Sequence, residues 1–428
     1  MPTPTGSRPS TPGSTAGPAL AIDGGIKAKS QPYGTGERFG AAEEAAVLAA
    51  LRSQHLWYIG GTRVFQAEDA IRSLFAVEHV VCCSSGTAAI HAALAACGVE
   101  PGDEVIVNPI SDWGSVAGVL ALGAIPVFCD IEPATFSLDP EALLRAITAK
   151  TRAILVVHLG GYPARIREIA GIARERSLKL IEDCAQTPLA EVDGTMIGMF
   201  GDAAAFSTND SKHISCGEGG FVITRDAETA RLVRLFTDKG YDRTAKRGTI
   251  AVGFLAFNYR MSELSAAVLG AQLVRLRDII AARRRYAARL LAGVQDIPGY
   301  APSIIAPGSA GSWWHILGRL TGKAASIGQQ RVAAALVAEG IPAYTGLSPS
   351  RVLYASPALV DHSLCARNRL LRADFLEGYD YRPGLCPVAE SLANTALILP
   401  CSEFFTDQDA DETAAGVRKV MRHFGEER

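Results

Sequence analysis

The stretch HVVCCSSGTAAIHAALAACG, residues 79–98, joins a short apolar run to a longer pattern rich in alanine. The first part predicts a buried strand and the second predicts a helix, so together they predict one strand–helix unit. The same alternation recurs downstream in DEVIVNP with SVAGVLALG, IPVFCDI with DPEALLRAIT, and AILVVHL with REIAGIARERS, followed by the strand candidates LKLIEDC, AAAFSTN and GGFVITRD. Strands and helices in this order predict an α/β fold with a mainly parallel sheet sandwiched by helices.

Length, charge and cysteine content limit the class of protein. The chain has 428 residues and a formal net charge of −2, so it offers no basic field for nucleic acid and no cationic face for a membrane. No apolar run is long enough to cross a bilayer, and the first residues lack the pattern of a signal peptide. The nine cysteines have no C-x-x-C pair and no metal-ligand spacing. We therefore expect a cytoplasmic protein with reduced core cysteines and no metal site.

Composition divides the chain into three parts. Residues 1–18 are mostly Pro, Gly, Ser and Thr, which predicts a disordered tail. Residues 19–285 carry the strand–helix units and predict a large domain. A long helical pattern begins after Ser262, the expected N-cap, and its arginine run Arg283–Arg285 is interpreted as a solvated face. Residues 286–428 predict a smaller C-terminal α+β domain.

Several predicted strands are followed by polar or aromatic residues at their carboxyl ends, where open parallel sheets bind ligands. Gly86 and Thr87 open the helix after the first strand, so free N–H groups and a hydroxyl favour an anion site there; the alternative is a tight turn with an N-cap. Asp183 ends another strand and either caps a helix or faces the cleft. Trp113 either joins the core or forms a flat wall for a ring.

One lysine lies among small and polar residues in STNDSKHISCGEGG, residues 207–220. Lys212 precedes a glycine-rich turn, and this placement favours a reactive amine over a surface side chain. Pyridoxal 5′-phosphate would use each part found so far. Its phosphate needs a helix N-terminus and hydroxyls, its ring nitrogen a carboxylate, its ring face an aromatic side chain, and its aldehyde a lysine. The chain supplies these parts in the order anion turn, aromatic, aspartate and lysine.

With these residues in place, the chain resembles the DegT/DnrJ/EryC1/StrS family of pyridoxal-phosphate aminotransferases, which has the fold type I architecture of aspartate aminotransferase. The resemblance runs from about residue 19 to the C-terminus. It is carried, in order, by LAIDGG, VFQAEDAIRSLF, SSGTAAIHAALAACGVEPGDEVIV, GAIPVFCDI, IEDCAQ, FGDAAAFSTNDSKHISCGEGGFVIT, NYRMSELSAAVLGAQLVRL and CPVAESLANTALILP. It implies that residues 19–285 form the cofactor-binding domain.

The resemblance assigns a role to each matching residue. Lys212 would be the Schiff-base lysine, and Asp183 would be the partner of the pyridine nitrogen. Gln186 would contact the ring hydroxyl, and Trp113 would stack on the ring. The phosphate contacts would be Gly86, Thr87 and Ser207. Asn258 would reach the phosphate in the neighbouring subunit, which implies a homodimer with shared active sites.

The same resemblance implies glutamate or glutamine as amino donor and a keto-sugar or keto-cyclitol as acceptor. LAIDGG and Trp113 resemble the branch that acts in antibiotic pathways and makes aminosugars or aminocyclitols, with a small polyhydroxylated ketone preferred and a nucleotide-linked sugar second. Candidate residues for a sugar-sized pocket are Trp57, Tyr58, Trp313, Trp314 and His315, whose alternative is interface or core packing. Two departures from the family affect the substrate pocket: Thr187-Pro188-Leu189-Ala190 replaces a His-Gly-Ala-like stretch, and STND replaces an aromatic after FS.

Two other functions stay open at this point. Similar enzymes that dehydrate sugars on the same cofactor carry histidine at the lysine position; Lys212 disfavours that reaction, although His213 is adjacent. A non-catalytic regulator on this fold would be expected to have lost the lysine or the aspartate, and this chain keeps Lys212 and Asp183.

Overall fold

The computed structural model describes residues 19–243, 252–346, 352–361 and 374–425, so the predicted tail at 1–18 lies outside the described residues. The eight cysteines within these ranges are all buried and form no disulfide. No helix within the same ranges combines the length and the apolar character needed to cross a membrane.

A seven-stranded sheet forms the centre of the large part of the molecule, in the order β1-β9-β8-β5-β4-β2-β3. Neighbouring strands pair in parallel except at β9, which is antiparallel to both β1 and β8. The strands are β1 His79–Cys83, β2 Glu104–Val107, β3 Ile125–Phe128, β4 Thr151–Val157, β5 Lys179–Asp183, β8 Ala203–Ser207 and β9 Gly220–Thr224. The mainly parallel sheet is therefore confirmed.

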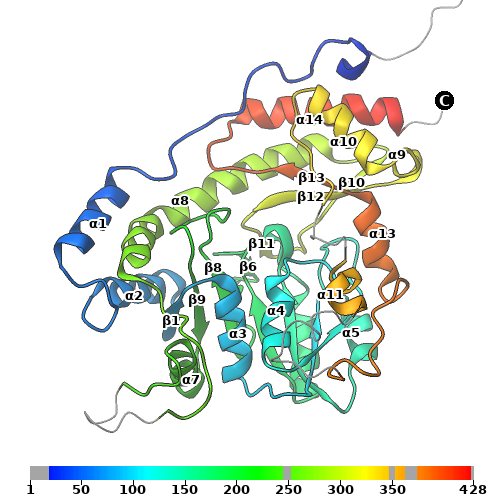
Figure 1. Ribbon diagram of the computed structural model, residues 1–428. Helices are drawn as coiled ribbons and strands as arrows, with labels where there is room; N and C mark the ends of the chain where they lie inside the picture. The colour runs from blue at the N-terminus through cyan, green and yellow to red at the C-terminus, as the bar shows by residue number, and fades with distance from the viewer. Residues whose placement is uncertain (1–18, 244–251, 347–351, 362–373, 426–428) are drawn as a thin grey trace, which may run out of the picture.

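Helices cover both faces of this sheet because alternate strand residues point to opposite sides (Figure 1). In β1, Val81 and Cys83 join a core with α3, α4 and α7, whereas Val80 and Cys82 join a core with α2, α5, α6 and the first half of α8. These helices are α2 Arg63–Phe75, α3 Gly86–Ala96, α4 Gly114–Ala121, α5 Pro140–Ala146, α6 Ile166–Glu175, α7 Ala227–Thr237 and α8 Glu263–Val294. Burial on both faces explains why the parallel strands read as continuous apolar runs.

Helix α8 connects the two halves of the molecule (Figure 1). Ser262 caps it as predicted, since its hydroxyl accepts the N–H of Ser265 at 3.1 Å. The N-terminal half of α8 packs against α1 and α2, and its C-terminal half packs against α14. The predicted domain boundary at residues 285 and 286 falls inside this helix and stays a prediction.

The C-terminal part contains a three-stranded antiparallel sheet, β10-β12-β13, with helices beside it. Its elements are β10 Tyr300–Pro302, β12 His315–Leu320, α9 Gly322–Ile327, α10 Gln329–Ala338, α11 Pro357–Val360, α13 Pro387–Thr395, β13 Ala396–Pro400 and α14 Asp407–Phe424. The remaining elements are α1 Ala41–Arg52, the short sheet of β6 Glu191–Val192, β7 Thr195–Met196 and β11 Ser309–Ala310, and the short 3-10 helices Ala21–Asp23, Leu159–Gly161 and Leu353–Ala355.

The segment before α1 packs against the C-terminal helices. Lys29 is buried and pairs with Asp409 at 2.6 Å and with Glu412 at 2.8 Å. The main-chain N–H groups of Ala21 and Ala28 both donate to Glu339 at 2.8 Å. These contacts fix the start of the described chain to α10 and α14.

The arginine run on α8 is not a uniform solvated face, and that prediction is wrong for Arg283 and Arg284. Arg283 is buried and pairs with Glu403 at 2.7 Å. Its guanidinium also donates to the main-chain carbonyls of Trp313, Trp314 and Cys401. Arg284 is half-buried and donates to two more carbonyls, while Arg285 is exposed. The two inner arginines face the junction between the halves of the molecule, where main-chain carbonyls need donors.

Candidate active site

A cavity of about 600 Å³ lies at the carboxyl ends of the parallel strands. Its lining combines residues from the start of α3, the start of α4, the end of β5 and the β8–β9 loop. Six of the residues predicted to contact a cofactor line it, namely Gly86, Thr87, Asp183, Gln186, Ser207 and Lys212. The fold thus brings together six predicted residues from three separate parts of the sequence.

Lys212 lies in the loop between β8 and β9, half-buried at the cavity wall. Its Nζ is 4.0 Å from the centre of the Trp314 ring. The guanidinium of Arg38 donates to the carbonyls of Asp210 and Lys212 and so fixes the loop. Burial lowers the pKa of Lys212, and the negative charges of Asp183 and Asp112 partly oppose this shift. A neutral amine is therefore more accessible here than on an exposed lysine.

Asp183 is buried at the end of β5 with its carboxylate on the cavity. Its oxygens accept the hydroxyl of Ser115 at 2.8 Å and the N–H of Ala185 at 3.1 Å. Burial raises the pKa of Asp183, while these two donors and the charge of Lys212 oppose the shift. Nearby, the Oε1 of Gln186 accepts the N–H of Gly160 at 2.5 Å, which fixes that side chain at the cavity wall.

The N-terminus of α3 forms the polar end of the cavity. Ser85 caps the helix by accepting the N–H of Ala88 at 3.1 Å, and Gly86 and Thr87 begin the first turn. A Cβ atom added to Gly86 would lie 2.7 Å from the Cβ of Ser207, so glycine allows the two segments to approach. A helix N-terminus bordered by two hydroxyl side chains is suited to a phosphate group.

These observations fit pyridoxal phosphate, the group that the family resemblance implies. The cavity offers an anion site at one end, a buried carboxylate, and an amine with a lowered pKa. Gly114 provides a second close approach, because a Cβ atom there would lie 2.6 Å from Oγ1 of Thr87. Glycines at positions 86 and 114 therefore allow the close approach of chain segments at the α3 end of the cavity.

Two predicted cofactor contacts do not line the cavity of their own chain. Trp113 is half-buried and packs against the core, whereas its neighbours Asp112 and Gly114 line the cavity. Asn258 is exposed, and its Oδ1 accepts the N–H of Arg260 at 3.3 Å. The stacking role of Trp113 and the partner-site role of Asn258 stay predictions.

Only Trp314 among the predicted substrate residues reaches the cavity. Tyr58 is buried and donates to Asp238 at 2.7 Å, and its neighbour Trp57 is half exposed. Trp313 is buried, with its ring edge-on to Tyr162. His315 is the first residue of β12, and burial of its ring lowers its pKa to about 4. Tyr58 and Trp313 thus pack in the interior, as in the alternative considered for this group.

Several cavity residues were not found from the sequence. They are Ser111, Asp112, Ser115, Asn209 and Glu218 in the lining, and Arg38 behind the lysine loop. A signal was available for Ser115, because it stands two residues after Trp113 in the first helical turn behind a strand end. No sequence pattern pointed to Arg38, which is 174 residues from Lys212.

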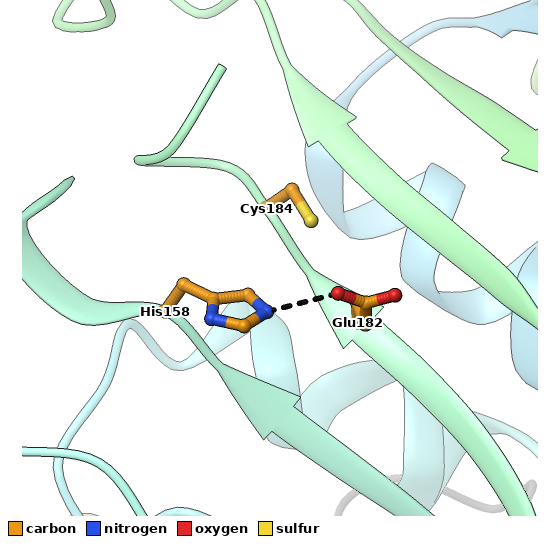
Figure 2. Close-up of side chains that lie close together, drawn as sticks. All are labelled: His158, Glu182 and Cys184. Atoms are coloured by element: carbon orange, nitrogen blue, oxygen red, sulfur yellow. Dashed lines mark hydrogen bonds and ion pairs between the residues drawn. The ribbon is translucent and has the colours of Figure 1, made fainter. Parts of the chain in front are cut away.

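A buried cluster of His158, Glu182 and Cys184 lies at the ends of β4 and β5, next to Asp183 (Figure 2). His158 Nδ1 accepts the N–H of Ala164 at 3.0 Å, so its Nε2 carries the proton and donates to Glu182 at 3.2 Å. Glu182 also accepts three main-chain N–H groups at 2.8 Å. Both ring nitrogens of His158 are therefore engaged, which favours a structural role in holding the strand of Asp183 over metal binding.

Comparisons with known proteins agree with this site. The chain is 36% identical over 425 residues to an L-glutamine:2-deoxy-scyllo-inosose aminotransferase of Streptomyces lividus, covering 95% of this chain and 98% of the relative. A protein of the same name from Streptomyces fradiae is 34% identical, with 94% and 98% covered. The solved structure of an aminotransferase from Psychrobacter cryohalolentis superposes with a TM-score of 0.81 at 26% identity, covering 92% of this chain and 100% of that one. The sequence model of the DegT/DnrJ/EryC1/StrS aminotransferase family matches residues 38–418, and the chain belongs to that family.

Proposed function

We propose that this aminotransferase transfers the amino group of L-glutamine to the ring ketone of a small cyclitol in aminocyclitol antibiotic biosynthesis, with a nucleotide-linked keto-sugar as second candidate. The observation that carries the proposal is the convergence of Lys212, Asp183 and the α3 anion site on one cavity, in a chain 36% identical over almost its full length to a glutamine-dependent cyclitol aminotransferase. The cofactor is pyridoxal phosphate, which supplies an electron sink for negative charge at the substrate carbon.

Each residue of the cavity has a proposed task. Gly86, Thr87 and Ser207 would hold the phosphate, and Asp183 would pair with the protonated ring nitrogen. Lys212 would bind the aldehyde carbon and then carry a proton to and from the reacting carbon. Its lowered pKa suits this task, because the neutral form of the amine, which accepts a proton, is more accessible than on an exposed lysine. Gln186 and Trp113 keep their predicted roles beside the ring.

The open side of the cavity supports a polyhydroxylated acceptor. Asn209, Ser211 and Glu218 line it, and Asn209 Nδ2 donates to Glu218 at 3.1 Å. Hydroxyl, amide and carboxylate groups are matched hydrogen-bond partners for ring hydroxyls. Glu218 would also disfavour a bound diphosphate through like-charge repulsion. This polar lining is the reason for preferring a free cyclitol ketone over a nucleotide-linked sugar.

Sugar dehydration is less well supported than amino transfer. Lys212 occupies the position at which similar dehydratases carry histidine, and the adjacent His213 does not line the cavity. The Nε2 of His213 donates to the carbonyl of Ser312 at 3.0 Å in the protein interior. Burial lowers the pKa of His213 well below its usual range, so the ring stays neutral. A non-catalytic regulator is also disfavoured, since the lysine and the aspartate share one cavity.

We further propose a homodimer with shared active sites. Asn258 is exposed and lies outside the cavity of its own chain. Large apolar side chains are exposed nearby in the sequence at Leu255 and Phe257, and on the α1–α2 side at Trp57 and Phe65. A crosslinker placed at position 258 should reach the cavity of a differently tagged partner. Crosslinks confined to one chain would reject the shared site.

A cytoplasmic location and the division into residues 19–285 and 286–428 are also retained as proposals. The location is supported by the buried, unpaired cysteines of the described residues. The division is supported by the separate sheets of the two parts.

The substrate proposal is tested with purified, cofactor-loaded protein and glutamine labelled with ¹⁵N at either the α-amino group or the amide. Given 2-deoxy-scyllo-inosose, the α-amino label should appear in the aminated cyclitol and the amide label should not. Nucleotide-linked keto-sugars are run in parallel. A kcat/KM far higher for a nucleotide-linked sugar than for any free cyclitol would reject the acceptor, and transfer from glutamate alone would reject the donor.

A further inference from the structure

A short chain of hydroxyl groups ends on Asp183. Ser115, in the first turn of α4, donates to Oδ2 of Asp183 at 2.8 Å, and the Oγ of Ser111 lies 2.7 Å from the Oγ of Ser115. Both serines line the cavity; Ser111 is 1% exposed and Ser115 is 2% exposed. Two buried hydroxyls thus connect the loop after β2 to the carboxylate at the end of β5.

The direction of this chain follows from the number of protons. A serine hydroxyl has one proton to donate, and an ionised carboxylate only accepts. Ser115 uses its proton for Asp183, so Ser111 must donate to Ser115. Both hydroxyl dipoles then point their positive ends toward Asp183, and each bond strengthens the next in the buried environment.

Asp183 needs this support because burial disfavours its charge. Within the described residues, its one other recorded donor is the N–H of Ala185 at 3.1 Å. Ser115 is itself held in place, since the adjacent Gly114 N–H donates to Asp112 at 2.8 Å and fixes the first turn of α4. The donor therefore belongs to a constrained helix end and not to a mobile side chain.

We propose that Ser111 and Ser115 are positioning residues that keep Asp183 ionised and directed into the cavity, so that it can pair with the protonated ring nitrogen of the cofactor. This inference rests on the proposed role of Asp183. It adds two residues that act through Asp183, and neither needs to touch the substrate.

The test measures the dissociation constant of pyridoxal phosphate from the full-length protein by equilibrium dialysis, from acid to neutral pH. Ser115→Ala removes a hydrogen bond to a charged group, so it should weaken cofactor binding about tenfold. The midpoint of the acid-side loss of affinity should move up by about one pH unit, because the carboxylate then takes up a proton more readily. Ser115→Thr keeps the hydroxyl and should restore the midpoint.

Ser137→Ala is the matched control. Ser137 is also buried, and its hydroxyl donates at 2.8 Å to the carbonyl of Val157, outside the cavity lining. It should leave the midpoint unchanged. Ser111→Ala should move the midpoint in the same direction as Ser115→Ala but less far. The double variant should move it no further than Ser115→Ala alone, because Ser111 acts through Ser115.

An unchanged midpoint in Ser115→Ala, or an equal shift in Ser137→Ala, would show that the serines only fill space. Circular dichroism checks the fold of each variant. If Ser115→Ala does not fold, the shift of the midpoint in Ser111→Ala is the result that tests the proposal. Asp183→Asn separates the two levels of the proposal. If it leaves cofactor affinity unchanged, the role of Asp183 fails; if it weakens binding while Ser115→Ala does not, only the hydroxyl chain is rejected.

Discussion

The amine of Lys212 lies over the ring of Trp314, with 4.0 Å between Nζ and the ring centre. The indole Nε1 donates at 2.8 Å to the carbonyl of Ser211, the residue before the lysine. Trp314 therefore contacts both the side chain of Lys212 and the main chain of the loop that holds it. One aromatic residue from the C-terminal part fixes the position of the lysine in the large part.

Two substitutions separate these contacts of Trp314. Trp314→Phe keeps a ring over the amine but loses the bond to Ser211, and we expect a modest fall in kcat. Trp314→Ala loses both contacts, and we expect kcat to fall by about 100-fold because the reacting group is no longer held in place. Steady-state kinetics measures both effects. Wild-type kcat in Trp314→Ala would contradict the positioning role.

Lys212→Ala should lower turnover by about 10⁴-fold, since it removes the amine that we propose moves protons in the cavity. The fold should persist, as judged by circular dichroism. Lys179→Ala is the control, because Lys179 pairs with Asp202 away from the cavity and its loss should leave kcat unchanged. Borohydride reduction of the wild-type protein followed by peptide mapping should find the cofactor on Lys212. A cofactor found on another lysine would refute the assignment.

Asp183→Asn should weaken cofactor binding by about 100-fold, because it removes one partner of a buried charge pair. The size of the side chain is nearly unchanged, so the effect reports on charge. Asp193→Asn provides a comparison at an exposed ion pair with Arg167 and should bind the cofactor like the wild type. Fluorescence titration of the cofactor-free proteins gives the dissociation constants. Equal affinities for the two variants would count against pairing with the ring nitrogen.

Arg283→Met should lower the free energy of unfolding by about 3–5 kcal/mol, because it leaves Glu403 buried without its partner and three carbonyls without a donor. The same change at Arg285, two positions along α8 and exposed, should stay within about 0.5 kcal/mol. Urea denaturation of the two variants compares them directly. Similar losses of unfolding free energy at Arg283 and Arg285 would mean that helix propensity, and not the buried contacts, determines the effect.

His91 should make the protein less stable in acid. It is buried in α3, and burial lowers its pKa to about 4. The unfolded chain binds this proton near its ordinary pKa of about 6.5. The unfolded state therefore holds more protons between these values, and stability is lost as the pH falls through that window.

Replacing this ring gives the measurement. His91→Phe should reduce the loss of unfolding free energy between neutral pH and about pH 4 by about 3 kcal/mol. The quantity compared is the change with pH, so any uniform effect of the phenylalanine cancels. His423→Phe, at an exposed position near the end of α14, should leave the pH dependence unaltered. If the unfolding free energy falls with decreasing pH equally in both variants, His91 is not the cause of the loss of stability in acid.

The sequence was sufficient for the central sheet and for the expectation that Asp183 and Lys212 lie close together, since both line one cavity. Strands of a parallel sheet are buried on both faces, so each of the seven appeared as an apolar run. Asp183 and Lys212 could be found because strand ends and the connections between strands meet at one edge of such a sheet. These features depend on short stretches of chain and need no knowledge of distant contacts.

Other features depend on contacts that no local pattern records. Trp313 and Trp314 are adjacent, yet Trp313 packs in the core against Tyr162 and Trp314 lines the cavity, and only the distant residues around them determine which ring faces inward. The prediction of a solvated Arg283 is wrong because burial of its charge depends on carbonyls supplied by residues about 30 to 118 positions away. The position of Ser115 in the first helical turn behind a strand end is a local signal, but its hydrogen bond to Asp183 is a contact across 68 residues of sequence.

Strand β9 runs against its neighbours, and this reversal has a consequence for redesign. The chain leaves the sheet after Ser207 and returns at Gly220. Because Ser207 and Gly220 pair with each other, the two ends of the loop at 208–219 are held close together. Thr208, His213, Ile214 and Ser215 in this loop are buried, so inserting or deleting residues there would disturb the packing that holds the amine. Redesign for a larger or smaller substrate is thus better directed at the exposed lining side chains Ser211 and Glu218 than at the length of the loop.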